Sequence, residues 1–296
     1  MVFCRRSILG CLAGALTARF RDAIADPVPR TPVAAAPACG AEGYTLQNNW
    51  TFGISNELTD ISSVQIAFDS CLPWGRTNGE LQIYTPFSPA THQIVGDELR
   101  LVAVAARGMG EGQIDSGQIV SKATWKPPMG GSAILEFCVK VPSGAGMWPS
   151  GWLYAVPTAH RNEIDVFEFV NNCTADHHDT TEGIYVYDHS GAIGRQTTAL
   201  GSLIDDDGKW RAPFDFAADF HTIAVEWAGN TVVRWVDGVK VATRFWTWAD
   251  ADPRIILNLA CGSVTEEWPG LPNAYSFENG ANVLACRYIR TWVKGV

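Results

Sequence analysis

The chain has 296 residues, of which 47% are hydrophobic and 18% are charged, and its formal net charge at pH 7 is −9. This acidic balance, without a Lys/Arg-rich patch after the first residues, argues against nucleic acid as a partner. Neutral polymers suit the charge better than anionic ones. Because all-β sandwiches commonly reach about 200–250 residues as one domain, we expect a single folded domain.

The first 25 residues predict an export signal. Arg5 and Arg6 precede a short apolar stretch, and small residues at 23–25 form a cleavage site. The paired arginines are typical of a twin-arginine signal, so we expect a secreted or periplasmic protein. The apolar stretch is too short to span a membrane, and no stable membrane insertion is expected. Residues 26–40 are rich in Pro and Ala and predict a linker, which leaves 41–296 as the folded domain.

Six cysteines remain after the signal is removed, namely Cys39, Cys71, Cys138, Cys173, Cys261 and Cys286. An even number in an exported chain predicts disulfide bonds, for which fifteen complete pairings exist. Cys138 lies in an apolar stretch and could instead be a buried free thiol. Since no CxxC or Cys/His ligand spacing occurs, we expect no metal cluster.

Short apolar runs rich in β-branched and aromatic residues recur along the chain, separated by Gly, Pro, Asn and Asp. Such runs predict strands. The expected strands span residues 81–84, 99–104, 133–139, 220–227, 231–236, 239–245, 255–260 and 288–293. Asp237 and Gly238 predict a two-residue hairpin turn of type I′. Because sustained helical periodicity is absent, the sequence predicts an all-β, antiparallel sandwich of the jelly-roll type.

A further strand, at residues 163–168, carries three carboxylates. Strict alternation places Glu163 and Asp165 on one face but sends Glu168 to the other. A one-residue β-bulge near Val166 or Phe167 would return Glu168 to the acidic face and Phe167 to the core. The segment therefore predicts three acids on one face of a bulged strand.

These acids suit glycoside hydrolysis. Retaining glycosidases need two carboxyl groups about 5–5.5 Å apart, and two glutamates roughly 13 Å apart at Cα could lean together. Like charges raise one another's pKa, so one acid should hold a proton near neutrality, as a general acid must. Ordinary surface charge on an exposed strand is the alternative. The nearby Trp148, Trp152 and Tyr154 favour the carbohydrate cleft.

Residues 163–168 match the Glu-x-Asp-x-x-Glu signature of glycoside hydrolase family sixteen, in the bulged form shared by laminarinases, agarases and carrageenases. Residues 142–152, 220–227, 236–238 and 256–260 resemble further family segments in the same order. The resemblance covers roughly residues 75–296. It implies a β-jelly roll with a concave substrate cleft and a retaining endo-β-glycoside hydrolase, with a β-1,3- or mixed-linked glucan as the first substrate to consider.

The resemblance also implies roles for single residues. Glu163 becomes the nucleophile, Glu168 the general acid/base, and Asp165 the neighbour that tunes both. Trp148 and Trp152 are expected to stack against sugar rings, although either could be a core residue. Further substrate contacts are expected from the strand after the acids, where laminarinase-like members carry a His; these are Tyr185, Tyr187 and His189.

Two alternatives use the same sequence features. A transglycosylase needs the same acids, whereas a non-catalytic, lectin-like jelly roll has no need of all three. The last strand lacks the Asp that binds structural calcium in many family members, so we expect no cofactor; a calcium site built partly from carbonyls would escape sequence reading. The expected partner is a polysaccharide or oligosaccharide substrate, and we expect a monomer.

Overall fold

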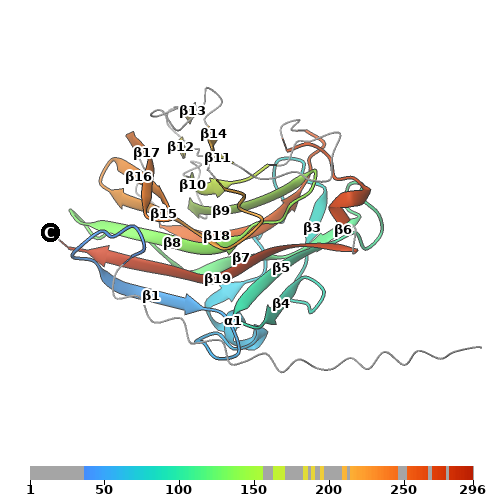
Figure 1. The fold of residues 1–296 in the computed structure, drawn as a ribbon, viewed down its shortest axis with the longest axis horizontal. Helices are drawn as coiled ribbons and strands as arrows, with labels where there is room; N and C mark the ends of the chain where they lie inside the picture. Colours follow the sequence, from blue (N-terminus) through green and yellow to red (C-terminus); the bar gives the residue numbers. More distant parts are fainter. Residues whose placement is uncertain are drawn as a thin grey trace, which may run out of the picture.

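The fold is described from a computed structural model. The described residues are 37–155, 163–170, 214–245, 252–265, 269–277 and 280–295, together with four short strands between residues 183 and 211. Nearly all regular structure in this part of the chain is β-strand, arranged in two sheets that lie one over the other (Figure 1).

The first sheet has ten strands among the described residues. Its main path runs β17 (Val239–Phe245), β16 (Thr231–Val236), β15 (His221–Ala228), β8 (Ser132–Lys140), β19 (Ala281–Lys294), β5 (Glu98–Val104), β6 (Ile114–Ser116) and β3 (Gln82–Tyr84). Off this path, β1 (Thr45–Thr51) pairs with β19 and β4 (His92–Val95) pairs with β5. The long β19 thus joins both halves of the sheet.

The second sheet has nine strands within the same described ranges. Its main path runs β13 (Gly194–Gln196), β12 (Asp188–Ser190), β10 (Glu163–Glu168), β9 (Met147–Ala155), β18 (Pro253–Cys261), β7 (Gln118–Thr124) and β2 (Phe68–Asp69). In addition, β11 (Gly183–Tyr185) pairs with β10 and with β14 (Lys209–Arg211). The acid-rich segment is β10, next to the central β9.

The core lies between the two sheets. On β8, alternate residues from Ala133 to Val139 are fully buried in it, and on β10 Ile164, Val166 and Phe167 are buried from the opposite side. Burying a large apolar side chain contributes about 1.5–3 kcal/mol, so this layer is the main stabilising feature. The paired strands are antiparallel apart from β3 and β6. The predicted all-β sandwich is confirmed.

The predicted hairpin is also confirmed. Asp237 and Gly238 have φ angles of 47° and 77°, as a type I′ turn requires, and they join β16 to β17. Both strands have the predicted bounds.

A short helix, α1 (Ile61–Ala67), is a feature that the search for helical periodicity did not find. It has only seven residues, too few for a clear period, and it depends on a capping box between Asp60 and Ser63. A 3₁₀ turn, η1, spans Ala274–Phe277. No helix in the described ranges is long and apolar enough to cross a membrane.

The first described residues lie in the predicted linker but contact the ten-stranded sheet. The backbone N–H of Ala38 donates to Glu136 on β8 at 2.8 Å. Cys39 and Tyr44 pack near Trp292 on the side of this sheet that faces away from the core. Ala38 and Cys39, in the predicted linker, therefore contact the folded domain.

The expectation of disulfide bonds is wrong for the five cysteines that the structure describes. Cys39, Cys71, Cys138, Cys261 and Cys286 are free thiols, and Cys173 lies outside the described residues. The last three of these five are buried in strands. Burial raises the pKa of Cys138 to about 12 and raises the thiol pKa of Cys261 and Cys286 as well. Such thiols behave as small apolar side chains, the alternative considered for Cys138.

Candidate active site

The strand β10 contains the predicted bulge. Asp165 pairs with Trp152 and Phe167 pairs with Gly151, so Val166 is the extra residue in β10 relative to β9. Both Val166 and Phe167 are fully buried in the core. Two consecutive residues therefore face the core, and alternation resumes with Glu168 on the other face. The predicted bulge is confirmed.

Two features of the sandwich hold this bulge. Gly151 leaves the space in which the ring of Phe167 lies, since a Cβ at this position would come within 2.4 Å of that ring. From the opposite sheet, the buried Arg234 donates to the carbonyl oxygen of Asp165 from Nε at 3.2 Å and from Nη2 at 2.9 Å. A guanidinium offers donors in a fixed fork, so it can direct two hydrogen bonds at one oxygen.

The register places the three acids in a row, which we call the acid row: Glu163, Asp165 and Glu168. Their partners on β9 are Tyr154, Trp152 and Ser150, respectively. The two glutamates are half-buried at the ends of β10, whereas Asp165 between them is only 2% exposed. The two outer acids are therefore accessible to a substrate, whereas the central acid is enclosed.

Trp148 lies at one end of this row. Its indole N–H donates to Oε1 of Glu168 at 3.1 Å, and its side chain is 3% exposed. Since the ring is buried, it does not offer an open face to a sugar, in contrast to the sugar-stacking role expected from the sequence. The indole instead fixes the orientation of the Glu168 carboxyl group.

Trp152 and Tyr154 are only partly buried and follow each other along the same face of β9. Their rings meet edge to face at 5.6 Å, and the exposed Trp74 contacts Tyr154 at the same distance and in a similar geometry. Partly exposed rings beside carboxyl groups suit stacking on sugars. Trp152 therefore keeps the position expected of a substrate-contacting residue, and Trp74 joins it.

On β18, the other neighbour of β9, two polar residues pair with residues of β9 that lie opposite the acid row. Asn258 pairs with Ser150 and accepts a hydrogen bond from the Trp152 indole N–H at 2.7 Å. Arg254 pairs with Tyr154 and contacts Asp69 at 3.3 Å. A hollow of about 540 Å³ lies against Arg254 at the β2 edge of the sheet, and its lining includes Lys122, Phe87 and Pro73.

The three predicted contacts after the acids are placed only in part. The backbone of Tyr185 on β11 pairs with Glu168, and the backbone of His189 on β12 pairs with Glu163. Both therefore come from strands next to the acids. Tyr187 lies outside the described residues.

Sequence reasoning missed Trp74, Arg234 and Asn258 as site residues. Trp74 stands in a Pro/Gly loop and Arg234 is a single charge in a strand, so neither gives a local signal. Asn258 is a polar residue inside an otherwise apolar run from Ile255 to Cys261, and this could have drawn attention to it. Within the described ranges, no group of three or more His, Cys, Asp and Glu side chains is placed to hold a metal ion.

Comparison with known proteins agrees with this geometry. The model of a protein family described as "Glycosyl hydrolases family 16" matches residues 129–270, which include β10 and most strands of the nine-stranded sheet. The match supports an assignment of the chain to family 16 of the glycosyl hydrolases. The family match and the glucanase relatives together indicate a glycoside hydrolase, and the acid row is its candidate catalytic centre.

Individual relatives are similar to this chain over more than the matched segment. A protein of Cryptopygus antarcticus named glucan endo-1,3-beta-glucosidase is 26% identical over 247 residues, which cover 75% of this chain and 83% of the relative. A beta-glucanase of Paenibacillus macerans is 30% identical over 168 residues, which cover 55% of this chain and 59% of the relative. The match with the first relative thus covers three quarters of this chain.

Among solved structures, the catalytic domain of an endo-1,3-beta-glucanase (laminarinase) from Thermotoga petrophila has the same fold. The two superpose with a TM-score of 0.64 at 22% identity, over 86% of this chain and all of the other. The jelly-roll fold therefore extends over both sheets, including the strands that precede residue 129.

Proposed function

We propose that the chain is a secreted, retaining endo-β-glycoside hydrolase that cleaves a β-1,3- or mixed-linked glucan. The observation that carries the proposal is the acid row, in which a bulge aligns Glu163, Asp165 and Glu168 on one face. A strand without the bulge would point Glu168 into the core. The bulge distorts an apolar strand so that a third acid stays on the accessible face. Such a distortion costs free energy, and catalysis accounts for it.

In the proposed reaction Glu163 is the nucleophile. Its carboxylate forms a bond to the anomeric carbon as the glycosidic C–O bond breaks, and Glu168 gives its proton to the leaving oxygen. Glu168 then removes a proton from water, which attacks the anomeric carbon and releases Glu163. The anomeric configuration is retained because the carbon is inverted twice. Asp165, enclosed between the two glutamates, tunes their charges.

Trp148 supports the role of Glu168. A hydrogen bond from the indole N–H holds the carboxyl group in one orientation through both halves of the reaction. A positioned acid/base contributes about 10²–10⁴-fold to rate, and such a contribution depends on orientation. We therefore propose that Trp148 positions the acid/base, in place of the sugar contact expected from the sequence.

The substrate proposal rests on the rings beside the acid row and on the relatives. Trp152, Tyr154 and Trp74 offer aromatic surface next to Glu163 and Asp165, and stacking on rings does not require charge on the polymer. Relatives of this chain carry the names glucan endo-1,3-beta-glucosidase and beta-glucanase. We propose Tyr185, Tyr187 and His189 as further substrate contacts, since two of them pair with the catalytic strand.

For the chain outside the described domain we propose an export signal of the twin-arginine type at residues 1–25, followed by a linker to the catalytic domain. Expression in a bacterium with and without twin-arginine export tests this. A processed protein that begins near residue 26 and is lost from the periplasm or medium without that export route supports the proposal. An unprocessed protein that stays in the cytoplasm contradicts it.

The function is tested with purified β-1,3-glucan, mixed-linked glucan, agarose, carrageenan and xyloglucan, with products sized by mass. We expect internal cleavage of a β-glucan by the wild type and none by Glu163→Gln, with folding intact. Full activity of this variant would refute the assignment of the acids. Products longer than the substrate would show a transglycosylase, and glycan binding without new reducing ends would show a lectin.

A further inference from the structure

Two buried amide side chains lie next to each other on the face of the nine-stranded sheet that carries the acid row. Asn258 on β18 and Gln118 on β7 are partners in the register, and Asn258 also pairs with Ser150, which is opposite Glu168. Asn258 is 4% exposed and Gln118 is 1% exposed. We call these two residues the amide pair. Because a buried amide is costly without hydrogen bonds, its partners indicate what it holds in place.

The first amide fixes the indole of Trp152. The indole N–H donates to Oδ1 of Asn258 at 2.7 Å, and Nδ2 of Asn258 donates to the hydroxyl oxygen of Tyr84 at 2.8 Å. An indole nitrogen can only donate, so the amide oxygen must face Trp152 and the amide nitrogen must face Tyr84. Tyr84 is buried on β3 of the other sheet, so its hydroxyl group prevents the amide from turning with the indole.

The second amide fixes the start of the loop that carries Trp74. Oε1 of Gln118 accepts a hydrogen bond from the backbone N–H of Leu72 at 2.8 Å, and the carbonyl oxygen of Leu72 accepts one from the N–H of Gly75 at 3.0 Å. Trp74 therefore lies in a turn whose first residue is tied to β7. The side chain of Leu72 belongs to the small apolar cluster against which Trp152 packs.

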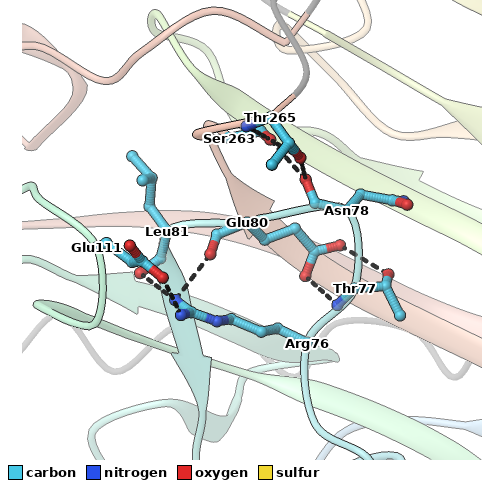
Figure 2. A network of polar contacts seen from close by, with 8 residues as sticks. All are labelled: Arg76, Thr77, Asn78, Glu80, Leu81, Glu111, Ser263 and Thr265. Carbon is cyan, nitrogen blue, oxygen red and sulfur yellow. Dashed lines mark hydrogen bonds and ion pairs between the residues drawn. The ribbon is translucent and has the colours of Figure 1, made fainter.

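The other end of this loop is fixed by Arg76 (Figure 2). Nη1 of Arg76 donates to the carbonyl oxygen of Glu80 at 2.8 Å, and Nη2 of Arg76 pairs with the carboxylate of Glu111. Ser263, just after β18, donates from its hydroxyl group to the carbonyl oxygen of Asn78. A loop held at both ends presents its exposed indole in one position.

The rings of Trp152, Tyr154 and Trp74 form a continuous series. Both indoles meet the Tyr154 ring edge to face, with centroids 5.6 Å apart, and Trp152 and Tyr154 pair with Asp165 and Glu163. Trp74 is 44% exposed and lies one ring farther from the acid row. A glucan chain that stacks on these rings meets Trp152 beside the acids and Trp74 only with a more distant sugar unit.

We propose that the amide pair positions these two indoles for the proposed hydrolysis, with Asn258 acting through Trp152 and Gln118 acting through the loop of Trp74. The inference rests on the proposed function, because that function gives the rings a substrate to hold. Neither amide touches the substrate or the acids. Since both indoles are held before the glucan binds, the amide pair lowers the cost of ordering the cleft.

Asn258→Leu tests the first half, because it removes both hydrogen bonds of this amide at similar volume. Rings held before binding stabilise the substrate and the transition state equally, so KM should rise about five- to tenfold while kcat changes less than about twofold. Asn258→Asp should restore KM, since one oxygen accepts from Trp152 and the other bonds Tyr84 in either protonation state. An unchanged KM, or an Asp variant no better than the Leu variant, would overturn the inference.

Tyr84→Phe removes only the group that fixes the amide. It should raise KM less than Asn258→Leu does, and it should have no further effect in the Asn258→Leu background, so the two changes should be strongly non-additive. Additive rises in KM would mean that Tyr84 acts by another route and would overturn the inference. If Asn258→Leu does not fold, Tyr84→Phe takes its place, and a KM equal to that of the wild type then has the same consequence.

Gln118→Leu tests the second half with oligosaccharides of increasing length from the glucan cleaved in the panel above. Because Trp74 meets a more distant sugar unit, KM should rise about five- to tenfold for chains that reach this indole and stay unchanged for the shortest ones. Trp74→Ala should show the same length dependence, and Gln118→Glu, which keeps an acceptor for Leu72, should restore KM. A rise in KM that is equal at every length would overturn the inference.

Asn49→Leu is the matched control for both variants. Asn49 on β1 of the other sheet accepts a hydrogen bond from Nε of Arg290 at 2.7 Å. Its loss should lower the free energy of unfolding but leave KM and kcat unchanged at every chain length. An equal rise in KM in this variant would mean that any lost amide loosens the cleft, and the inference would fail.

A spectroscopic test needs no hydrolysis. In ¹⁵N-labelled protein the indole N–H of Trp152, assigned by its loss in Trp152→Phe, should exchange with solvent at least about tenfold faster in Asn258→Leu than in the wild type. The backbone N–H of Leu72 should respond to Gln118→Leu in the same way. Equal exchange rates in variant and wild type would overturn the inference. A wild type that cleaves no glycan would refute the proposed function, while this test would still decide whether the amide pair holds the two elements.

Discussion

The guanidinium group of Arg234 donates two hydrogen bonds to the backbone carbonyl oxygen of Asp165, at 2.9 and 3.2 Å. Arg234 comes from β16 in the ten-stranded sheet and Asp165 from β10 in the other, so the contact crosses the core. The carbonyl immediately precedes Val166, the extra residue of the bulge. The geometry of the acid row therefore depends on a buried side chain of the opposite sheet.

We predict that Arg234→Lys lowers kcat at least about tenfold while the protein still folds. An ammonium group is a point charge and cannot supply the two fixed donors of the guanidinium fork, so the carbonyl loses at least one hydrogen bond. Steady-state kinetics and near-UV circular dichroism check this. The control is Arg107→Lys, which loses a similar fork to Asp115 on the surface and should keep full activity. Equal kcat values for the two variants would show that the bulge does not need Arg234.

Trp148→Phe should lower kcat about tenfold, because Glu168 loses the hydrogen bond that orients it. Trp125→Phe is the matched control, since the Trp125 indole is also buried but its N–H has no hydrogen-bond partner within the described part of the chain. It should leave kcat unchanged. Single-turnover rates of both variants make the comparison; equal losses would assign Trp148 to packing alone.

A larger side chain at Gly151 should also destabilise the bulge. The methyl group of Gly151→Ala would overlap the buried Phe167 ring, and we expect the free energy of unfolding to fall by about 1–3 kcal/mol. Gly295→Ala adds a methyl group where nothing lies within 4 Å and should change it little. Urea denaturation measures both variants, and an unaltered midpoint for Gly151→Ala would contradict the observed packing.

The acid row could be predicted from sequence because its signals are local. Two apolar residues between Asp165 and Glu168 conflict with strict alternation, and a bulge resolves the conflict. Arg234 gives no such signal. In β16, Arg234 occupies an inward position between Val232 and Val236. The role of this lone charge depends on its contact with Asp165, which is distant in the chain.

The cysteines show that composition alone does not predict disulfide bonds. Their even number and the predicted export favoured disulfide bonds, but pairing requires Cβ atoms about 4 Å apart, which counting cannot test. Cys138 and Cys286 lie on the neighbouring strands β8 and β19. Cys286 belongs to the core between the sheets and Cys138 does not, so neighbouring strands alone do not make a pair.

Glu80 should make stability depend on pH. Its pKa is about 7 in the folded protein against an ordinary value of 4.5, so between these values the folded state holds a proton that the unfolded state has lost. Stability is therefore full below about pH 4.5, falls as the pH rises to about 7, and is then constant, with a total loss of about 3 kcal/mol. The raised pKa of Glu136 acts in the same direction.

Glu80→Gln should remove only the part of this loss that Glu80 causes. Urea denaturation at about pH 5 and about pH 8 should give a smaller difference for this variant than for the wild type, whereas Glu111→Gln should match the wild type. If the difference is the same in all three proteins, Glu80 titrates near its ordinary value and its burial has little electrostatic effect.

The most direct test of the central claim is to trap the covalent intermediate. A 2-deoxy-2-fluoro β-laminaribioside with a good leaving group should inactivate the wild type and add one glycosyl group, because fluorine slows both steps whereas the leaving group speeds only the formation of the intermediate. Peptide mapping by mass spectrometry should locate this group on Glu163. Attachment to any other residue, or turnover with inversion at the anomeric carbon and no adduct, would contradict the account.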